Sequence, residues 1–174
     1  MRKIVLNDTN IIIDLMSVNL FDSLFRLPWE VHITDMVKEE LTREGQLTLA
    51  EEAIERGCLL VDKFSGEEVG EIHEWHERIQ GITNLSICDC SVWYASEKRG
   101  YIVLTGDKKL RNVVEESGVE VHGVLYVLQT MVDELLISPS EAISILRQLQ
   151  AFNQRLPKND IDTYVNKWKC LIEL

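Results

Sequence analysis

The chain contains 174 residues, of which 45% are hydrophobic and 27% are charged, a composition typical of globular proteins and unlike that of disordered chains. This length is enough for one domain with a substantial hydrophobic core. The formal net charge of −11 argues against broad, purely electrostatic binding to nucleic acids, because such binding needs a basic surface.

The N-terminal segment and the cysteines indicate a reducing, intracellular environment. The first apolar run covers only residues 4–6, which is too short for a signal peptide or a membrane span, so we expect a cytoplasmic protein with no membrane partner. The four cysteines, at positions 58, 88, 90 and 170, form no CxxC pair and no zinc-ligand spacing. We therefore expect them to be reduced and buried as small hydrophobic side chains.

Short apolar runs that alternate with helical patterns predict a parallel sheet with helices on both faces. The strands are expected at residues 4–6, 31–33, 58–61, 101–105 and 119–122. Helices are expected at residues 11–16, 19–26, 47–56, 67–79, 87–99 and 108–117, and after a cap at Thr34 or Asp35. The predicted fold class is α/β, a three-layer α/β/α sandwich around a central parallel sheet.

The pattern becomes entirely helical from residue 124 onward. An apolar segment covers residues 124–136, and Ser138 and Glu141 form a capping box that begins a helix running to about Phe152. A final amphipathic helix covers residues 160–172. We predict a single domain over residues 1–174, with a C-terminal helical extension over about 124–174 that could serve as a dimerisation surface, a partner site or a lid.

Four acidic residues lie at the ends of the predicted elements, where an α/β fold could bring them together. Asp8 and Asp107 each follow an apolar strand and precede a helix. Both therefore fall at the carboxyl ends of parallel strands, where open α/β sheets place their sites. Asp89 lies in the first turn of the helix that Ser86 caps, and Glu40 lies on the helix that follows the second strand.

Helical periodicity places Glu40 toward the other elements. Glu40 shares one stripe with Val37 and Leu41, two residues expected to face the core. Glu44 continues this stripe, whereas Glu39 points elsewhere. Four gathered carboxylates would repel one another unless cations neutralised them, and oxygen-rich clusters suit Mg²⁺ or Mn²⁺. The pattern therefore predicts metal-assisted hydrolysis of a phosphodiester.

Each of these carboxylates also has an ordinary structural interpretation. Asp8 could cap a helix, and Asp107 could form a turn. Asp89 could be a first-turn residue that the helix dipole stabilises, and Glu40 could be a solvated helix residue. Taken singly, each acidic residue is explained as well by these roles as by a site.

Four motifs in this order resemble those of the PIN domain family, metal-dependent nucleases with a parallel sheet between helices. They are Leu6-Asn7-Asp8-Thr9-Asn10, residues 34–41 ending in Glu40-Leu41, residues 85–95 around Asp89, and residues 104–111 around Asp107. The resemblance covers roughly residues 3–125, and bacterial chains of this size resemble VapC-like toxins, which are ribonucleases paired with antitoxins. It favours a shared acidic site over four unrelated structural roles.

The resemblance also implies roles for individual residues. The family's catalytic and metal-binding cluster falls on Asp8, Glu40, Asp89 and Asp107. These carboxylates would hold one or two Mg²⁺ or Mn²⁺ ions that activate a water molecule and stabilise charge on the phosphate. Asn10 and Thr105 would orient the carboxylates from a second layer, and Lys108 and Arg111 would touch the substrate backbone.

The function implied is that of an endoribonuclease that hydrolyses RNA phosphodiester bonds and acts as the toxin of a toxin–antitoxin pair. The implied partners are RNA, an antitoxin protein and a second copy of the chain. Two alternatives stay open. The chain could be a catalytically inert PIN-like module that binds proteins, or a nuclease or phosphodiesterase that acts on another nucleic acid, such as DNA.

Overall fold

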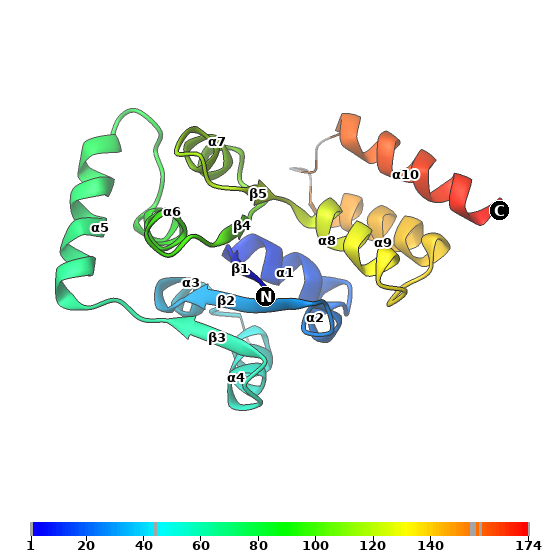
Figure 1. Cartoon of the computed structure of the whole chain (residues 1–174), viewed down its shortest axis with the longest axis horizontal. Coiled ribbons are helices and arrows are strands. Elements are labelled where there is room, and N and C mark those ends of the chain that lie inside the picture. Colours follow the sequence, from blue (N-terminus) through cyan, green and yellow to red (C-terminus); the bar gives the residue numbers. More distant parts are fainter. Residues whose placement is uncertain (1, 44, 154–155, 157, 174) are drawn as a thin grey trace.

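The computed structural model describes residues 2–43, 45–153, 156 and 158–173 (Figure 1). Five parallel strands form one sheet in the order β3-β2-β1-β4-β5. The strands are β1 Lys3–Asn7, β2 Trp29–Thr34, β3 Leu59–Asp62, β4 Ile102–Leu104 and β5 Val121–His122. The predicted parallel sheet is thus confirmed, and each predicted strand is present.

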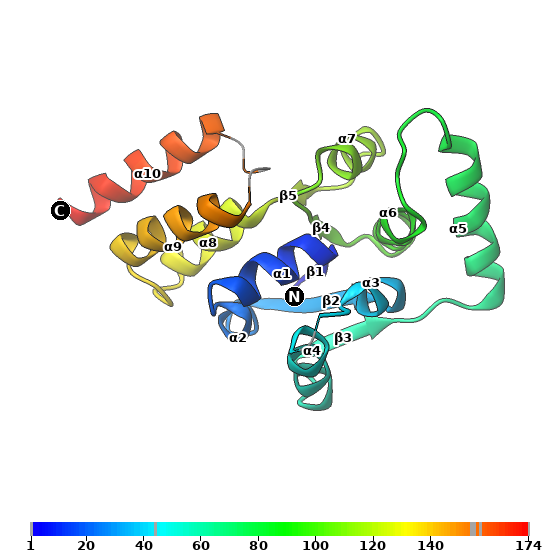
Figure 2. The same cartoon turned by 180° about the vertical axis from the view of Figure 1, so that it is seen from behind.

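Helices cover both faces of the sheet and complete the predicted α/β/α sandwich (Figures 1 and 2). They are α1 Thr9–Ser17, α2 Phe21–Leu24, α3 Asp35–Glu40, α4 Gln46–Glu55, α5 Gly66–Ile79, α6 Ile87–Arg99, α7 Lys108–Glu116, α8 Val124–Asp133, α9 Pro139–Phe152 and α10 Lys158–Ile172. Helix α6 packs against β2, β1 and β4, whereas α5 packs on α6 and stands away from the sheet.

The order of the strands fixes where a site can form. From β1 the chain builds the sheet outward through β2 to β3, and then crosses to the other side of β1 to form β4 and β5. The strand order therefore reverses between β1 and β4. Open α/β sheets usually place their sites at the carboxyl ends of the two strands that flank such a reversal. The backbone N–H of Asp8 donates to the carbonyl oxygen of Leu104 at 3.0 Å, which joins these two strand ends directly.

Side-chain caps fix the ends of several helices as the sequence predicted. Ser86 and Ser138 each form a complete capping box, at the starts of α6 and α9. Thr34, rather than Asp35, caps α3, because its hydroxyl oxygen accepts a hydrogen bond from the backbone N–H of Val37 at 3.1 Å. The cap at Ser86 orients the first turn of α6, which carries Asp89.

Helix α3 is shorter than its stripe of residues suggested. It ends at Glu40, and Leu41 leaves the helix with ψ near 69° while remaining 1% exposed. Leu41 is buried, as expected, but the prediction that the helix continues through Leu41 is wrong. Leu41 reaches the core from the residues that follow the helix. Glu44 lies outside the described residues.

The C-terminal helices α8, α9 and α10 form a bundle at one end of the molecule (Figure 2). Trp168 of α10 is 0% exposed, and its indole N–H donates to Gln129 Oε1 of α8 at 3.0 Å. This buried anchor holds α10 against the rest of the bundle. Among the described helices, none combines the length and apolar character that crossing a bilayer requires.

All four cysteines are free thiols, but only two of them are buried. Cys88 and Cys90 lie in the core on α6. Cys58 precedes β3 at the surface, and Cys170 lies on α10, which buries only one side. The prediction of burial is therefore wrong for Cys58 and Cys170.

Candidate active site

Asp8 follows the last residue of β1, caps α1 and is only 4% exposed. Its Oδ1 accepts a hydrogen bond from the backbone N–H of Thr9 at 2.7 Å. Its Oδ2 accepts hydrogen bonds from Thr105 Oγ1 at 2.6 Å and from Asn10 Nδ2. Burial, reinforced by the negative charge of Asp89, outweighs these hydrogen bonds and raises the pKa of Asp8 to about 7.

Thr105 and Asn10 tie the loop after β4 to the carboxylate of Asp8. Besides donating to Asp8, Thr105 Oγ1 accepts a hydrogen bond from the backbone N–H of Asp107 at 3.0 Å. Asn10 Oδ1 accepts from the backbone N–H of Gly106 at 2.7 Å. A Cβ atom at Gly106 would lie 2.9 Å from Asn10 Oδ1, so a larger residue at this position would displace the side chain of Asn10. The side chains of Thr105 and Asn10 therefore fix the position of Asp8 relative to the loop that carries Asp107.

Asp89 lies in the first turn of α6, as its ordinary interpretation expected, and completes the capping box there, whereas Asp107 caps α7. Asp89 Oδ2 accepts hydrogen bonds from the backbone N–H and the hydroxyl of Ser86, both at 2.8 Å. Asp107 Oδ1 accepts from the backbone N–H groups of Lys109 and Leu110 at 2.7 and 3.1 Å. In the described part of the chain, these bonds occupy one oxygen of each carboxylate. Capping therefore orients both side chains without using their second oxygens.

Glu40 approaches Asp8 through a neighbouring residue. It is the last residue of α3, and its Oε2 accepts a hydrogen bond from Thr9 Oγ1 at 2.6 Å. Glu40 is exposed, so the core-facing position expected for it from the stripe is wrong. Thr9 is nevertheless the residue next to Asp8, so Glu40 is directed toward the carboxyl end of β1.

The four carboxylates lie close enough to influence one another electrostatically, and together we call them the acidic site. Burial raises the pKa of Asp89, and the charges of Asp107 and Glu40 raise it further, against the opposing hydrogen bonds at the start of α6. Asp8 and Asp89 interact in the same way. The fold thus brings the predicted acidic residues from four segments toward one region.

A divalent cation fits this region in charge and in donor type. Within the described residues, none of the ion pairs involves a carboxylate of the acidic site. Carboxylate oxygens are the donors that Mg²⁺ and Mn²⁺ prefer. In the part of the chain that the structure describes, no three His, Cys, Asp or Glu side chains lie close enough together to enclose a metal ion. The carboxylates would have to draw together to form a coordination sphere.

Two residues at the acidic site were not predicted to belong there. Thr9 links Asp8 to Glu40, and its place between two motif residues was the signal available in the sequence. Cys88 is 4% exposed, and burial together with the nearby charges of Glu40 and Asp8 raises the pKa of its thiol. Its place directly before Asp89 in the sequence was the signal available for this cysteine.

Lys108 and Arg111 lie on α7 beside the acidic site but in different environments. Lys108 is exposed at the first turn. The guanidinium of Arg111 donates to the carbonyl oxygens of Thr105 at 3.1 Å and Val121 at 3.3 Å, and Arg111 Nη1 lies 3.5 Å from Glu115 Oε1. Arg111 is therefore fixed to the backbone, whereas Lys108 extends toward solvent.

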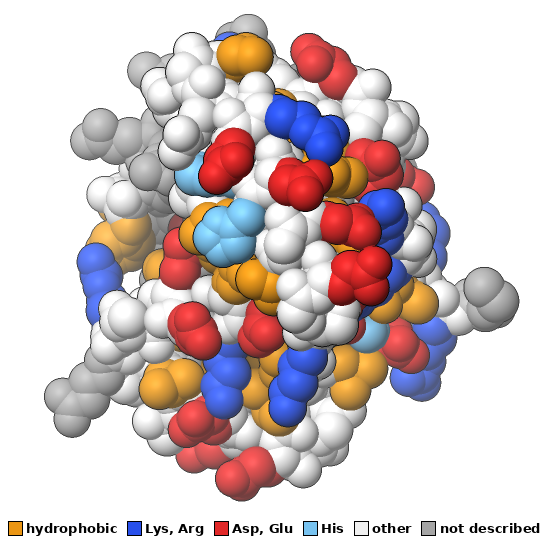
Figure 3. Space-filling model, turned by 90° about the vertical axis from the view of Figure 1, so that its left-hand side faces the viewer, with side chains coloured by type: hydrophobic (Ala, Val, Ile, Leu, Met, Phe, Trp, Pro, Cys, Tyr) orange, Lys and Arg blue, Asp and Glu red, His pale blue; other side chains and the backbone are white. Residues whose placement is uncertain are grey.

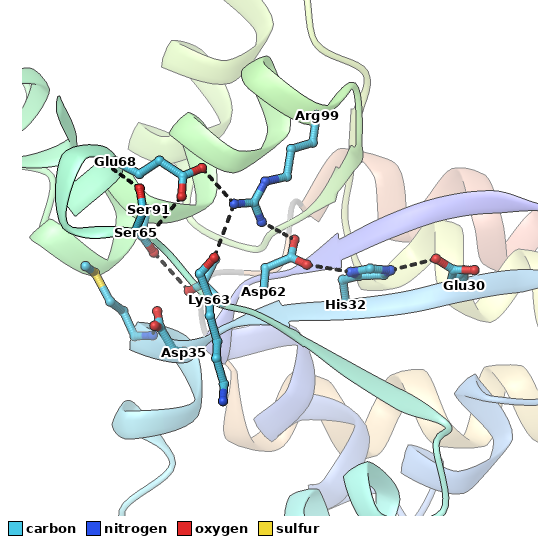
Figure 4. A network of polar contacts seen from close by, with 11 residues as sticks. Glu30, His32, Asp35, Asp62, Lys63, Ser65, Glu68, Ser91 and Arg99 are labelled. Atoms are coloured by element: carbon cyan, nitrogen blue, oxygen red, sulfur yellow. Dashed lines mark hydrogen bonds and ion pairs between the residues drawn. The ribbon is translucent and has the colours of Figure 1, made fainter.

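A second polar network lies in the sheet away from the acidic site (Figure 4). His32 Nδ1 is 2.9 Å from Asp62 Oδ1, and His32 Nε2 is 2.9 Å from Glu30 Oε1. Arg99 Nη1 is 3.1 Å from Asp62 Oδ2, and Arg99 Nη2 is 3.0 Å from Glu68 Oε1. Burial alone would lower the pKa of His32, but the two carboxylates outweigh it and raise this pKa. The network joins β2 and β3 to α5 and α6.

The face around α5 carries acidic and basic side chains side by side (Figure 3). Lys98 Nζ lies 3.4 Å from Glu71 Oε2, and Arg78 Nη2 lies 3.2 Å from Glu74 Oε2. These two basic groups are therefore paired with carboxylates. This pairing makes the α5 face a poor surface for an RNA backbone.

Comparison with solved structures shows distant likenesses. The crystal structure of VapBC2 from Rickettsia felis, bound to a DNA fragment from its promoter, shares 12% identity, covers 69% of this chain and 98% of that chain, and has a TM-score of 0.49. The structure of FitAcB from Neisseria gonorrhoeae shares 17% identity, covers 67% of this chain and 95% of that chain, and has a TM-score of 0.41. Among curated proteins, none matches the chain.

Comparison with family models gives a match to most of the chain. The model DUF3368, described as a PIN domain, matches residues 4–169. The matched region runs past the motifs recognised in the sequence and covers α8, α9 and most of α10. The chain therefore belongs to the PIN domain family.

Proposed function

We propose that the protein is a metal-dependent endoribonuclease whose acidic site binds Mg²⁺ or Mn²⁺. The observation that carries this proposal is the environment of Asp8. This carboxylate is buried, is oriented by three hydrogen bonds and lies near the negative charge of Asp89, with no ion-pair partner among the described side chains. A buried charge needs compensation, which a bound cation would supply. Membership of a family of nucleases supports the same function.

The residues of the site would divide the work. Asp8, Glu40, Asp89 and Asp107 would hold the cation, which would supply activation of a water molecule and neutralisation of charge on the phosphate. Asn10 and Thr105 would keep Asp8 in one orientation.

The remaining side chains would act on water and on the substrate. Glu40, the most exposed of the four carboxylates, would also orient the attacking water, and Thr9 would position Glu40. Lys108 would contact a substrate phosphate from the first turn of α7, and Arg111 would contact the substrate beside it. The single positive charge of Lys108 suits a phosphate oxygen.

A cleavage assay tests this proposal against its alternatives. Single-stranded RNA and DNA of one sequence would be incubated with the protein in EDTA, Mg²⁺ or Mn²⁺. We expect internal cleavage of RNA that depends on the metal, and little cleavage of DNA. Cleavage of DNA alone would favour a nuclease that acts on DNA. No cleavage of either polymer would favour a catalytically inert module that binds proteins.

We also propose that the protein is the toxin of a toxin–antitoxin pair, with an antitoxin protein and a second copy of the chain as partners. Family membership supports this role. Leu135 and Phe152, which are strongly exposed beside the C-terminal helices, offer apolar surface that a protein partner would cover. Co-expression with the product of the neighbouring gene tests it. We expect a stable complex that suppresses cleavage, and free protein with full activity would contradict the role.

A further inference from the structure

A pocket of about 640 Å³ lies beside the acidic site, between α7, the end of β5, α8 and α10. Thr105 and Gly106 line the pocket, and the same residues bond to Asp8 and Asn10 of the site. The pocket and the acidic site therefore share one loop. A polymer bound across the acidic site would reach the pocket by passing over Gly106.

The described charged residues that line this pocket are mostly acidic. Among the residues that the structure describes, Lys108 and Arg111 are its basic lining residues, against the carboxylates of Asp14, Glu115 and Asp160. Asp14 Oδ2 accepts a hydrogen bond from Asn153 at 2.8 Å, and Glu115 is paired with Arg111. Asp160 is exposed in the first turn of α10. A ligand that donates hydrogen bonds to carboxylates fits this lining better than an anion does.

Planar groups supply stacking surfaces in the same pocket. The ring of His122 stacks on Tyr126 with centroids 3.7 Å apart and an interplanar angle of 11°. Tyr126 in turn stacks on Trp29 at 5.8 Å and 3°, so it supports the ring of His122 and offers no open face of its own. The guanidinium of Arg111 is fixed by two backbone carbonyl oxygens, and Tyr164 lines the side formed by α10. Unpaired bases stack on aromatic rings and on guanidinium planes of this kind.

We propose that this base pocket, lined by Arg111, His122, Tyr126, Asp160 and Tyr164, binds an unpaired nucleobase of the RNA beside the cleaved bond, and that it prefers guanine. The Watson–Crick edge of guanine presents adjacent N–H donors that a carboxylate can accept together. Uracil presents one N–H group between two carbonyl oxygens, which a carboxylate repels. The identification of the polymer as RNA rests on the proposed function.

The test uses mononucleotides, so it requires neither metal nor cleavage. The whole protein in EDTA would be titrated calorimetrically with GMP, guanosine, UMP and inorganic phosphate. We expect GMP and guanosine to bind with similar affinity, UMP to bind roughly tenfold or more weakly, and phosphate not to compete with GMP. Asp160→Asn should weaken GMP binding roughly tenfold, because a charge-assisted hydrogen bond is lost. Asp162→Asn, an exposed change on the same helix, should leave GMP binding unchanged.

Several results would overturn the base pocket. Equal affinity for GMP and UMP would remove the preference for guanine. Competition by phosphate would show an anion site, and unaltered GMP binding by Asp160→Asn would remove the carboxylate from the recognition. RNA cleavage without guanine binding would reject the pocket and leave the proposed function standing. Absence of RNA cleavage would reject the function, while the GMP titration would still decide the pocket.

Discussion

Replacing Asp8 with asparagine should change how the stability of the metal-free protein depends on pH. The pKa of Asp8 is about 7 in the fold against an ordinary value of 3.8, so its ionisation opposes folding. This destabilisation is absent below about pH 3.8, grows as the pH rises and is complete above about pH 7. One pKa unit corresponds to about 1.4 kcal/mol, so the full effect is about 4 kcal/mol, of which about 2.5 kcal/mol develops between pH 5 and pH 8.

The asparagine variant removes this titration but loses part of the hydrogen bonding. All the groups that bond to Asp8 are donors, so one of them would face the new amide group, at a cost of about 1–3 kcal/mol at every pH. The free energy of unfolding of Asp8→Asn should therefore rise by about 2.5 kcal/mol relative to that of wild type between pH 5 and pH 8. Urea unfolding in EDTA, followed by tryptophan fluorescence, measures this difference, with Asp162→Asn as an exposed control. A difference between variant and wild type that does not change with pH would refute the reasoning.

Three further changes test separate parts of the structure. Glu40→Gln should reduce RNA cleavage at least tenfold more than Glu39→Gln, because Glu40 is the residue that accepts a hydrogen bond from Thr9. Equal losses in initial rate would show that Glu40 contributes no more to cleavage than Glu39 does. Thr105→Val should lower the free energy of unfolding by about 1–3 kcal/mol, since it leaves the backbone N–H of Asp107 without its partner; a loss under about 0.5 kcal/mol in urea titrations would contradict this. The raised pKa of His32 means that its stabilising charge is fully present below about pH 6.5 and is lost as the pH rises through the higher folded value. His32→Gln should therefore reduce the fall in urea midpoint between pH 6 and pH 9, and an unaltered fall would show that His32 is not its source.

Features set by neighbouring residues in the chain could be predicted from the sequence. The apolar runs indicated all five strands, and the capping boxes at Ser86 and Ser138 marked helix starts that the structure confirms. The end of α3 was not predicted, because Leu41 is buried by leaving the helix rather than by continuing it. Where a helix ends depends on the elements that it packs against, and the local sequence pattern gives no information about them.

Contacts between distant segments explain what the sequence did not reveal. Thr9 and Glu40 are separated by 31 positions, and only the packing of α1 and α3 brings them together. The pairing of His32 with Asp62 depends on the register of β2 and β3 in the same way. The position of Asp8 at a strand end was predictable, but the donors that surround it come from α1 and from the loop after β4. The roles of these residues in catalysis stay predictions.

Cleavage of end-labelled single-stranded RNA by wild type, Asp107→Asn and Asp133→Asn tests the central claim most directly. Asp107 belongs to the acidic site, whereas Asp133 is an exposed residue at the end of α8. Because the asparagine at position 107 can still cap α7, its effect should fall on the chemistry rather than on the fold. We predict rapid cleavage in Mn²⁺ by wild type and Asp133→Asn, none in EDTA, and at least a hundredfold slower cleavage by Asp107→Asn. Equal rates for all three proteins, or cleavage that persists in EDTA, would contradict a metal-dependent nuclease at this site.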